Sequence, residues 1–350
     1  MRDFKIGPHW VGENRPPFVI AEMSGNHNQS LERALAIVDA AAKAGAHALK
    51  LQTYTADTMT LDSTRPQFRV DSTNKLWEGE TLYNLYEKAH TPWKWHKEIF
   101  DRAKRRGMAA FSSPFDSTAV DFLEKLNVPA YKIASFENGD WPLIKRIAAT
   151  GKPVIMSTGM ASLGELDESV RLLREHGCRD LILLKCTSSY PAKPKDSHLR
   201  TIPHLSAAFD CVAGLSDHTL GIGAAVASVA LGARAVEKHF TLDRGDGGVD
   251  SAFSADPTEL AALVRETRTA FEALGSPSLA ADTPDRFNRQ FRRSVYVSRD
   301  VRKGQRFTTK NLKVIRPAGG LEPKHFEAVL GRRARRDLAL GTPLSWDHLL

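Results

Sequence analysis

Short apolar runs alternate with longer amphipathic segments along the first 275 residues. Each run of four to six residues is typical of a buried strand, and each segment that follows has apolar positions at helical spacing. The expected strands are 18–21, 46–51, 108–111, 130–133, 153–156, 181–185, 211–215 and 233–236. Eight strands that alternate with helices predict an α/β fold of the (β/α)₈ TIM barrel type.

Helix boundaries in this region carry recognisable signals. Ser162 is followed three residues later by Glu165, and Asp256 by Glu259, which is the pattern of a capping box. An open doubly wound sheet is the alternative architecture. It is disfavoured because no glycine-rich phosphate loop follows the first strand, which ends at Glu22.

The remaining chain divides into three parts. A long insertion, 53–92, interrupts the alternation and contains a helical piece at 82–89, as expected of a functional cover or binding loop. Residues 276–290 have the composition of a linker between the barrel, 1–275, and a C-terminal domain, 291–350. Alternating positions and frequent glycines in that last part predict a small β-rich domain.

Charge is distributed unevenly between these parts. The net charge is +8, but residues 286–350 hold 16 lysines and arginines against 5 acidic residues, a balance of +11 that leaves −3 for the rest. A basic domain fits an acidic small molecule or an acidic protein face. Nucleic acid is disfavoured as a partner, because aromatic residues do not alternate with the basic ones and no nucleic-acid-binding motif is present.

Cysteines and hydropathy bear on location. The three cysteines, Cys178, Cys186 and Cys211, are an odd number without metal-type spacing, as expected of reduced thiols in a cytoplasmic protein. No apolar stretch is long enough to cross a membrane, and no signal region follows the N-terminus. A cytoplasmic protein without a membrane partner is the expectation.

Polar side chains follow each predicted strand, and a barrel brings these strand ends to one mouth. They include Glu22, Lys50, Gln52, Ser113, Lys132, Ser135, Glu137, Ser157, Lys185, Ser188, Tyr190, Ser216, His218, Glu237, Lys238 and His239. One such residue alone is more often a helix cap or a solvated group. The whole ring predicts a site for an anion, because unpaired lysines in a mouth would repel one another.

Two histidines follow the last two predicted strands, His218 in GLSDHT (214–219) and His239 in EKHF (237–240). Neighbouring strand ends lie close together in a parallel barrel, so the two imidazoles are expected to share one divalent metal ion. The alternative is that each histidine is simply satisfied at a strand edge.

With these residues in place, the sequence resembles the sialic acid synthase family, and most closely the branch that makes pseudaminic acid. The resemblance is carried by AEMSGNHN (21–28), KLQTY (50–54), SSPFD (112–116), KIASFE (132–137), MSTGM (156–160), KCTSSYP (185–191), the two histidine motifs and FRRS (291–294). It implies a TIM barrel followed by an antifreeze-like (SAF) domain. It also implies a domain-swapped homodimer.

The resemblance further implies a reaction and its residues. The reaction condenses phosphoenolpyruvate with an N-acylated amino sugar, here 2,4-diacetamido-2,4,6-trideoxy-altrose, or alternatively N-acetylmannosamine or the legionaminate precursor. The family's phosphoenolpyruvate contacts match Lys50, Ser113, Lys132, Ser135, Ser157, Ser188 and Ser216. The family binds a metal, usually Mn²⁺ with Mg²⁺ or Co²⁺ as alternatives, and its metal-binding residues match His218 and His239. Its sugar contacts match Glu22, Gln52, Tyr190, Asp250 and, from the partner subunit, the position of Arg316.

For the catalytic roles, Lys132 is expected to offset substrate charge and Glu22 to activate water, with Glu137 in reserve. Two rival functions remain at this stage. One is a class I aldolase that forms a Schiff base on Lys132 or Lys185. The other is a binding module for nucleic acid or carbohydrate on an inert barrel.

Overall fold

The computed structural model describes residues 3–70, 79–277 and 284–350. Residues 71–78 of the expected insertion and 278–283 of the expected linker therefore lie outside the described residues. The chain forms two compact units, Met1–Gly275 and Ser276–Leu350, which are described separately.

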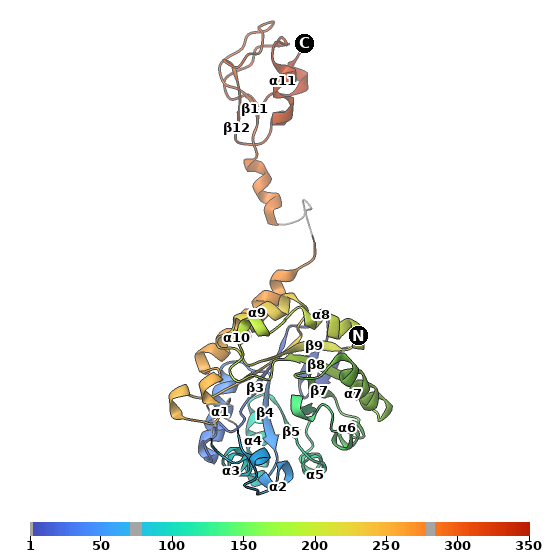
Figure 1. The fold of residues 1–350 in the computed structure, drawn as a ribbon. Coiled ribbons are helices and arrows are strands. Elements are labelled where there is room, and N and C mark those ends of the chain that lie inside the picture. The colour runs from blue at the N-terminus through green and yellow to red at the C-terminus, as the bar shows by residue number, and fades with distance from the viewer. Residues whose placement is uncertain (1–2, 71–78, 278–283) are drawn as a thin grey trace. The chain divides into compact units, whose positions relative to one another are not determined.

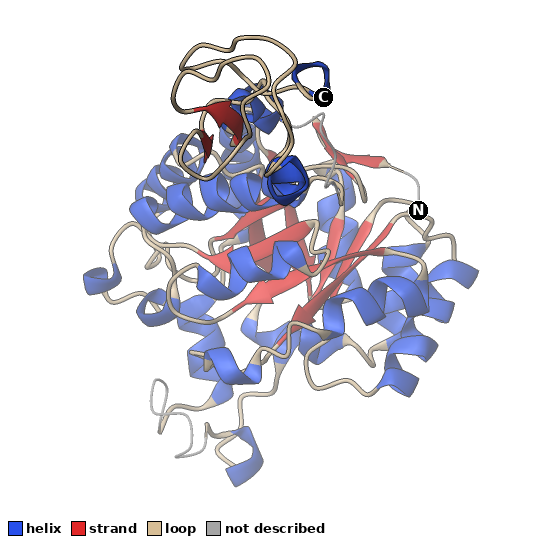
Figure 2. Ribbon diagram, turned by 90° about the horizontal axis from the view of Figure 1, so that it is seen from above, coloured by secondary structure: helices blue, strands red, loops and turns tan. Residues whose placement is uncertain are grey.

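The first unit is a closed barrel of eight parallel strands, so the open-sheet alternative is wrong. Figures 1 and 2 show the strands surrounded by helices. The strands, given in chain order, are β3 (Phe18–Glu22), β4 (Ala48–Thr53), β5 (Ala109–Pro114), β6 (Tyr131–Ile133), β7 (Val154–Ser157), β8 (Leu181–Cys186), β9 (Val212–Asp217) and β10 (Ala235–His239). β10 pairs with β3 and closes the ring.

The helices of the outer ring follow the strands as predicted. They are α1 (Leu31–Lys43), α4 (Trp93–Arg105), α5 (Ser117–Lys125), α6 (Trp141–Ala148), α7 (Leu163–Glu175), α8 (Thr201–Phe209), α9 (Gly223–Ala230) and α10 (Pro257–Leu274). Both predicted capping boxes form, at Ser162 with Glu165 and at Asp256 with Glu259. Each box satisfies backbone N–H groups that have no partner within the helix, which fixes where the helix begins.

A short antiparallel hairpin precedes the barrel and was not predicted. It pairs β1 (Phe4–Ile6) with β2 (His9–Val11), and its turn at Gly7 lies against Ala109, the first residue of β5. The hairpin therefore lies at the N-terminal end of the barrel, away from the strand ends that carry the polar residues. Strands of three residues are too short to show a period in the sequence.

The insertion after β4 adds two helices beside the barrel mouth. These are α2 (Ala56–Met59) and α3 (Leu82–Ala89), with a 3₁₀ turn at Pro66–Phe68 between them. Thr55 and Thr81 cap the two helices by accepting backbone N–H groups. The predicted helical piece at 82–89 is therefore confirmed.

The second unit has its own small core, built from Val295, Val297, Phe307, Leu312, Val329, Ala334, Leu338 and Leu344. Its regular secondary structure is sparse: β11 (Ser294–Val297) pairs antiparallel with β12 (Leu312–Ile315), and α11 (Phe326–Val329) is one turn long. Residues 284–291, in the expected linker, form a 3₁₀ helix. No helix of the described chain is long and apolar enough to cross a membrane.

Candidate active site

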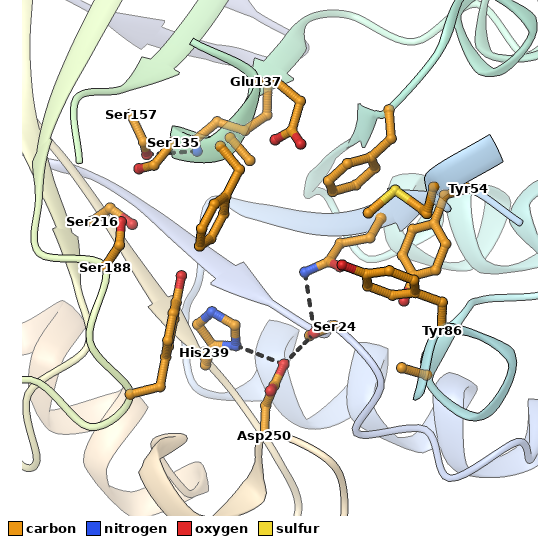
Figure 3. A pocket seen from close by; sticks show the side chains of 18 of the residues that line it. Ser24, Tyr54, Tyr86, Ser135, Glu137, Ser157, Ser188, Ser216, His239 and Asp250 are labelled. Atoms are coloured by element: carbon orange, nitrogen blue, oxygen red, sulfur yellow. Dashed lines mark hydrogen bonds and ion pairs between the residues drawn. The ribbon is translucent and has the colours of Figure 1, made fainter. Parts of the chain in front are cut away.

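A cavity of about 710 Å³ opens at the C-terminal ends of the barrel strands. Figure 3 shows side chains that turn into it from strand ends on one side and from the insertion on the other. We call its charged base, formed by Lys50, Lys132, Ser216 and Glu237, the floor. Its apolar side, described below, is called the wall.

Every charge of the floor is paired. Lys50 Nζ lies 2.7 Å from Glu22 Oε2 and 3.6 Å from Glu237 Oε1, and Lys132 Nζ lies 3.8 Å from the same Glu237 oxygen. The side chains of these two lysines and two glutamates are all buried. The expectation that these lysines are unpaired is therefore wrong, because carboxylates already offset both ammonium groups.

Burial and pairing shift the two lysines in opposite directions. Burial disfavours the ammonium of Lys50, but the Glu22 and Glu237 carboxylates outweigh it and raise the pKa of Lys50. Burial dominates at Lys132, whose pKa is lowered although Glu237 opposes the shift. The floor thus combines one firmly charged lysine with one that gives up its proton more readily.

Hydroxyl groups form a cradle beside Lys132. Ser157 Oγ accepts from Lys132 Nζ at 2.7 Å, and Ser135 Oγ accepts from the Gly159 N–H at 3.1 Å. A Cβ atom at Gly159 would lie 2.2 Å from Ser188 Oγ, so only glycine leaves room for these groups. An ammonium, hydroxyls and a backbone N–H close together are the donors that a phosphate or carboxylate needs.

The two histidines meet above the floor. They lie at the ends of the neighbouring strands β9 and β10, and their ring centroids are 5.3 Å apart. Both line the cavity and are less than 10% exposed. Tyr190 packs against them, 4.4 Å from the His218 ring and 6.3 Å from the His239 ring.

The donor set of this pair fits a divalent metal. His218 Nδ1 lies 2.9 Å from the Thr187 carbonyl, so this nitrogen donates, and Nε2 of the neutral ring keeps a lone pair for a metal. His239 Nδ1 lies 3.4 Å from Asp250 Oδ2 and has no hydrogen-bond partner among the described residues. No group of three or more metal-binding side chains occurs in the described parts of the chain, so a metal here would need further ligands from substrate or water.

A chain of polar groups links this pair to the floor. Gln52 Nε2 donates to Glu22 Oε1 at 2.9 Å and to Ser24 Oγ at 3.1 Å, and Ser24 in turn donates to Asp250. Dashed lines in Figure 3 trace part of this chain to His239. Ser24 has a φ of +47°, which is uncommon for a residue with a side chain and is found at functional sites.

Glu137 is a carboxyl group of the cavity that has no cationic partner within ion-pair distance among residues 3–70, 79–277 and 284–350. It ends a 3₁₀ turn, Ser135–Glu137, and its Oε2 has no hydrogen-bond partner in the described structure. Burial raises its pKa to about 7, although Lys132 opposes the shift. Both protonation states are therefore accessible near neutral pH, as a group that transfers protons requires.

The wall faces the histidines with aromatic and aliphatic groups. It is formed by Tyr54, Met59, Leu82, Leu85, Tyr86 and Phe115, largely from the insertion. Tyr54 packs edge-on against both Tyr86 and Phe115, with centroids 5.6 Å and 5.2 Å away. Burial raises the pKa of Tyr54 well above its usual value, so its hydroxyl stays neutral. Such a surface suits methyl groups and the apolar faces of a ligand.

Most residues singled out in the sequence line this cavity. They are Lys50, Gln52, Lys132, Ser135, Glu137, Ser157, Ser188, Tyr190, Ser216, His218, His239 and Asp250. Glu22 and Ser113 are buried behind the lining, in contact with Lys50. Arg316 is exposed in the second unit, directly after β12.

Two lysines of the predicted ring do not belong to the site. Lys185 and Lys238 point to the opposite face of their strands, because side chains alternate along a strand and their neighbours line the cavity. Lys185 donates to the Cys186 carbonyl at 2.7 Å, and Lys238 pairs with Asp217. Lys185 therefore cannot serve as the Schiff-base lysine of this cavity.

Sequence reasoning also left out residues that line the cavity. Ser24 and Cys186 lie beside residues that were named, and Cys186 was missed because Lys185, which precedes it, was itself expected to face the mouth. The wall residues gave no comparable signal. An aromatic or aliphatic side chain in a loop is compatible with either a core or a binding surface.

Comparison with known proteins identifies the family. Residues 37–278 match the NeuB family, and residues 292–350 match the SAF domain. The chain belongs to the NeuB family. It is 45% identical to pseudaminic acid synthase of Campylobacter jejuni, covering 93% of this chain and 95% of that protein. It is 42% identical to pseudaminic acid synthase of Helicobacter pylori, covering 96% and 98%.

A solved structure of a relative has the same fold. The N-acetylneuraminic acid synthetase of Leptospira borgpetersenii superposes with a TM-score of 0.72 at 33% identity, covering 82% of this chain and 95% of that one. The relatives named here are synthases, as the family resemblance implied, and not class I aldolases or binding modules. The predicted barrel with a SAF domain is confirmed.

Proposed function

We propose that this NeuB-family protein condenses phosphoenolpyruvate with 2,4-diacetamido-2,4,6-trideoxy-altrose to give pseudaminic acid and phosphate. The observation that carries the proposal is a single cavity in which a lysine–serine cradle, a histidine pair and an apolar wall meet. Relatives named pseudaminic acid synthase, 42–45% identical over more than nine-tenths of the chain, support this choice of product.

The same reaction on another sugar is the second candidate. A relative named N,N'-diacetyllegionaminic acid synthase is 35% identical over 91% of the chain, and one named N-acetylneuraminate-9-phosphate synthase is 34% identical over 77%. The wall favours the first candidate over a neuraminate precursor. A 6-deoxy sugar with two acetamido groups presents more methyl surface to Tyr86 and Leu85 than a fully hydroxylated chain does.

The cradle and floor would handle the charges of phosphoenolpyruvate. Lys50 and Lys132 would offset phosphate and carboxylate, and the hydroxyls of Ser135 and Ser157 would complete the donor set. As C3 of phosphoenolpyruvate bonds to the aldehyde carbon, C2 becomes electron-poor and water adds to it. The bond from C2 to the phosphate oxygen then breaks and releases phosphate.

Proton transfer in this scheme falls to a carboxyl group. Glu137 lines the cavity with a pKa of about 7, so it can remove a proton from the water that attacks C2. Glu22 is buried behind the lining and bonded to Lys50 and Gln52, where it positions those two side chains. We therefore give Glu137 the role first expected of Glu22.

The proposal includes a divalent metal, most simply Mn²⁺, held by His218 and His239. When bound, it supplies a Lewis acid next to the aldehyde oxygen. Asp250 lies beside His239 and would orient that ring. A cytoplasmic location is also part of the proposal, supported by the three free, buried cysteines.

We further propose that a second copy of the chain closes the mouth as a domain-swapped homodimer, with Arg316 reaching the sugar. Large apolar side chains that follow β6, β7 and β9 support this, since Phe136, Met160 and Leu220 are each more than half exposed at the rim. Light scattering on the full chain should give twice the mass of 38.7 kDa.

The decisive experiment measures phosphate release from phosphoenolpyruvate with a panel of amino sugars. We expect turnover with Mn²⁺ and the trideoxy-altrose sugar, at least tenfold slower turnover with N-acetylmannosamine, and none after chelation. Full activity of a chelated sample would overturn the metal's role. A preference for N-acetylmannosamine would favour the second candidate.

A further inference from the structure

A buried ion pair lies directly behind the two histidines, on the opposite face of the barrel strands. Lys238 Nζ is 2.7 Å from Asp217 Oδ2, and both side chains are only 1% exposed. Lys238 immediately precedes His239, and Asp217 immediately precedes His218. Because side chains alternate along a strand, the pair points outward wherever the histidines point inward.

The pair is part of a larger hydrogen-bond network. Lys238 Nζ also donates to the Thr219 carbonyl at 2.6 Å. Asp217 Oδ1 accepts from the Thr219 N–H at 3.0 Å and from its hydroxyl at 2.8 Å. Lys238 and Asp217, from neighbouring strands, therefore both hydrogen-bond to Thr219, the residue that follows His218. His218 thus lies between two residues that are held in place, Asp217 and Thr219.

This network lies where backbone pairing between β9 and β10 stops. The ladder between β9 and β10 ends at the pair Lys238 and Asp217. His218 and His239 thus lie one residue beyond the last paired position between their two strands. The network continues the connection past that point, since it ties the Lys238 side chain of β10 to Thr219 in the loop after β9.

Stability alone is a poor explanation for such a pair. Desolvation of two buried charges offsets most of their attraction, and apolar side chains of similar volume are often as stabilising. What a bonded pair provides is fixed geometry. Residues that hydrogen-bond to metal ligands commonly change metal affinity by roughly 10- to 100-fold when they are altered. The Lys238–Asp217 pair would act on the two histidines through the backbone instead.

We propose that Lys238 and Asp217 are positioning residues, which hold the His218 and His239 imidazoles at the separation that a divalent cation requires. The inference rests on the proposed function only in one respect, namely that His218 and His239 bind a divalent cation. Neither residue lines the cavity, and neither bonds to Lys50 or Lys132. Binding of phosphoenolpyruvate at the floor is therefore expected to be independent of the pair.

The test uses the full chain and the double variant Lys238→Met/Asp217→Asn, which leaves no unpaired charge in the core. Its control is Lys152→Met/Glu124→Gln, which removes another ion pair of 2.6 Å that does not contact the histidines. The Mn²⁺ dissociation constant is measured by electron paramagnetic resonance of free Mn²⁺. Circular dichroism and the melting temperature show that each variant is folded.

We expect the Mn²⁺ dissociation constant to rise at least tenfold in the Lys238/Asp217 variant and to stay within twofold in the control. The KM for phosphoenolpyruvate should not change in either. Wild-type Mn²⁺ affinity in a folded Lys238/Asp217 variant would overturn the inference. Should that variant fail to fold, Asp217→Asn alone, which keeps an oxygen for Thr219, must show weaker Mn²⁺ binding.

Failure of this inference is separable from failure of the proposed function. If the wild-type protein binds Mn²⁺ but condenses none of the sugars, the function is wrong while the affinity comparison still decides the role of the pair. If the wild-type protein binds no Mn²⁺, the inference is overturned together with the metal's role.

Discussion

The floor and the wall of the cavity are built by different rules. The floor comes from the ends of barrel strands, where Lys50, Lys132 and Glu237 are buried and joined in one network of ion pairs. The wall comes largely from helices of an insertion, where Tyr86 and Leu85 make apolar contacts without charge. Strand ends belong to the core, whereas the insertion can vary without disturbing it.

This difference assigns different consequences to the two regions. A charge removed from the floor leaves its partners unpaired and removes donors that every substrate needs. A group removed from the wall changes only the fit of the sugar. We therefore expect floor variants to lose activity towards all sugars equally, and wall variants to change the ratio between sugars.

The largest effect is expected for Lys132→Met. This substitution removes the ammonium that bonds to Ser157 and faces Glu237, so kcat/KM should fall about 10³-fold with every accepted sugar. Phosphate release across the sugar panel measures it. Lys185→Met is the matched control, because Lys185 is also at a strand end but faces away from the cavity, and its loss should be less than tenfold.

A changed ratio between sugars in Lys132→Met would contradict the division between floor and wall. So would a loss in Lys185→Met as large as that in Lys132→Met, since it would mean that the face of the strand does not matter.

A smaller and selective effect is expected for Tyr86→Ala. The substitution opens the wall next to Tyr54, so kcat/KM for the 6-deoxy sugar should fall roughly tenfold relative to that for a 6-hydroxy sugar. Competition between the two sugars measures the ratio directly. Tyr83→Ala, on the same helix but outside the cavity lining and with a bond to Asp57, should leave the ratio unchanged.

Sequence reasoning predicted the floor far better than the wall. Strand periodicity and the rule that polar strand ends converge brought Lys50, Lys132, His218 and His239 to one place. The wall depends on how a 40-residue insertion packs, for which Tyr54 and Leu85 give no periodic signal. The predicted roles of individual residues came from the resemblance to a family, since spacing alone cannot distinguish a substrate contact from a helix cap.

The errors have one physical origin. A residue taken to lie beyond a strand end is assigned no face, whereas alternation sets the face of every residue within the strand. Lys238 was placed in the mouth because the predicted strand ended at residue 236, whereas β10 continues to His239 and Lys238 pairs with Asp217 on the outer face. The pairing of Lys50 with Glu22 was missed because ion pairs across strands depend on register.

The last effect concerns stability at the mouth and comes from Glu137. Its pKa is raised from 4.5 to about 7 because burial disfavours the carboxylate. Between these two values the folded protein binds more protons than the unfolded chain, so stability falls as the pH rises through this interval. Above pH 7 the cost is constant and at most on the order of 3 kcal/mol, reduced by the solvent that reaches the mouth.

Glu137→Gln should remove this cost. Urea unfolding is therefore expected to give a variant that is more stable than the wild-type protein at pH 8 by up to about 3 kcal/mol, with the difference vanishing near pH 4.5. The same variant should lose condensation activity, because glutamine cannot accept a proton from water. Equal stability of the two proteins at pH 8 would mean that Glu137 is not desolvated, and its role in proton transfer would lose its physical basis. A stabilised but inactive variant would instead show that this carboxylate is kept at the mouth for chemistry, at the expense of the fold.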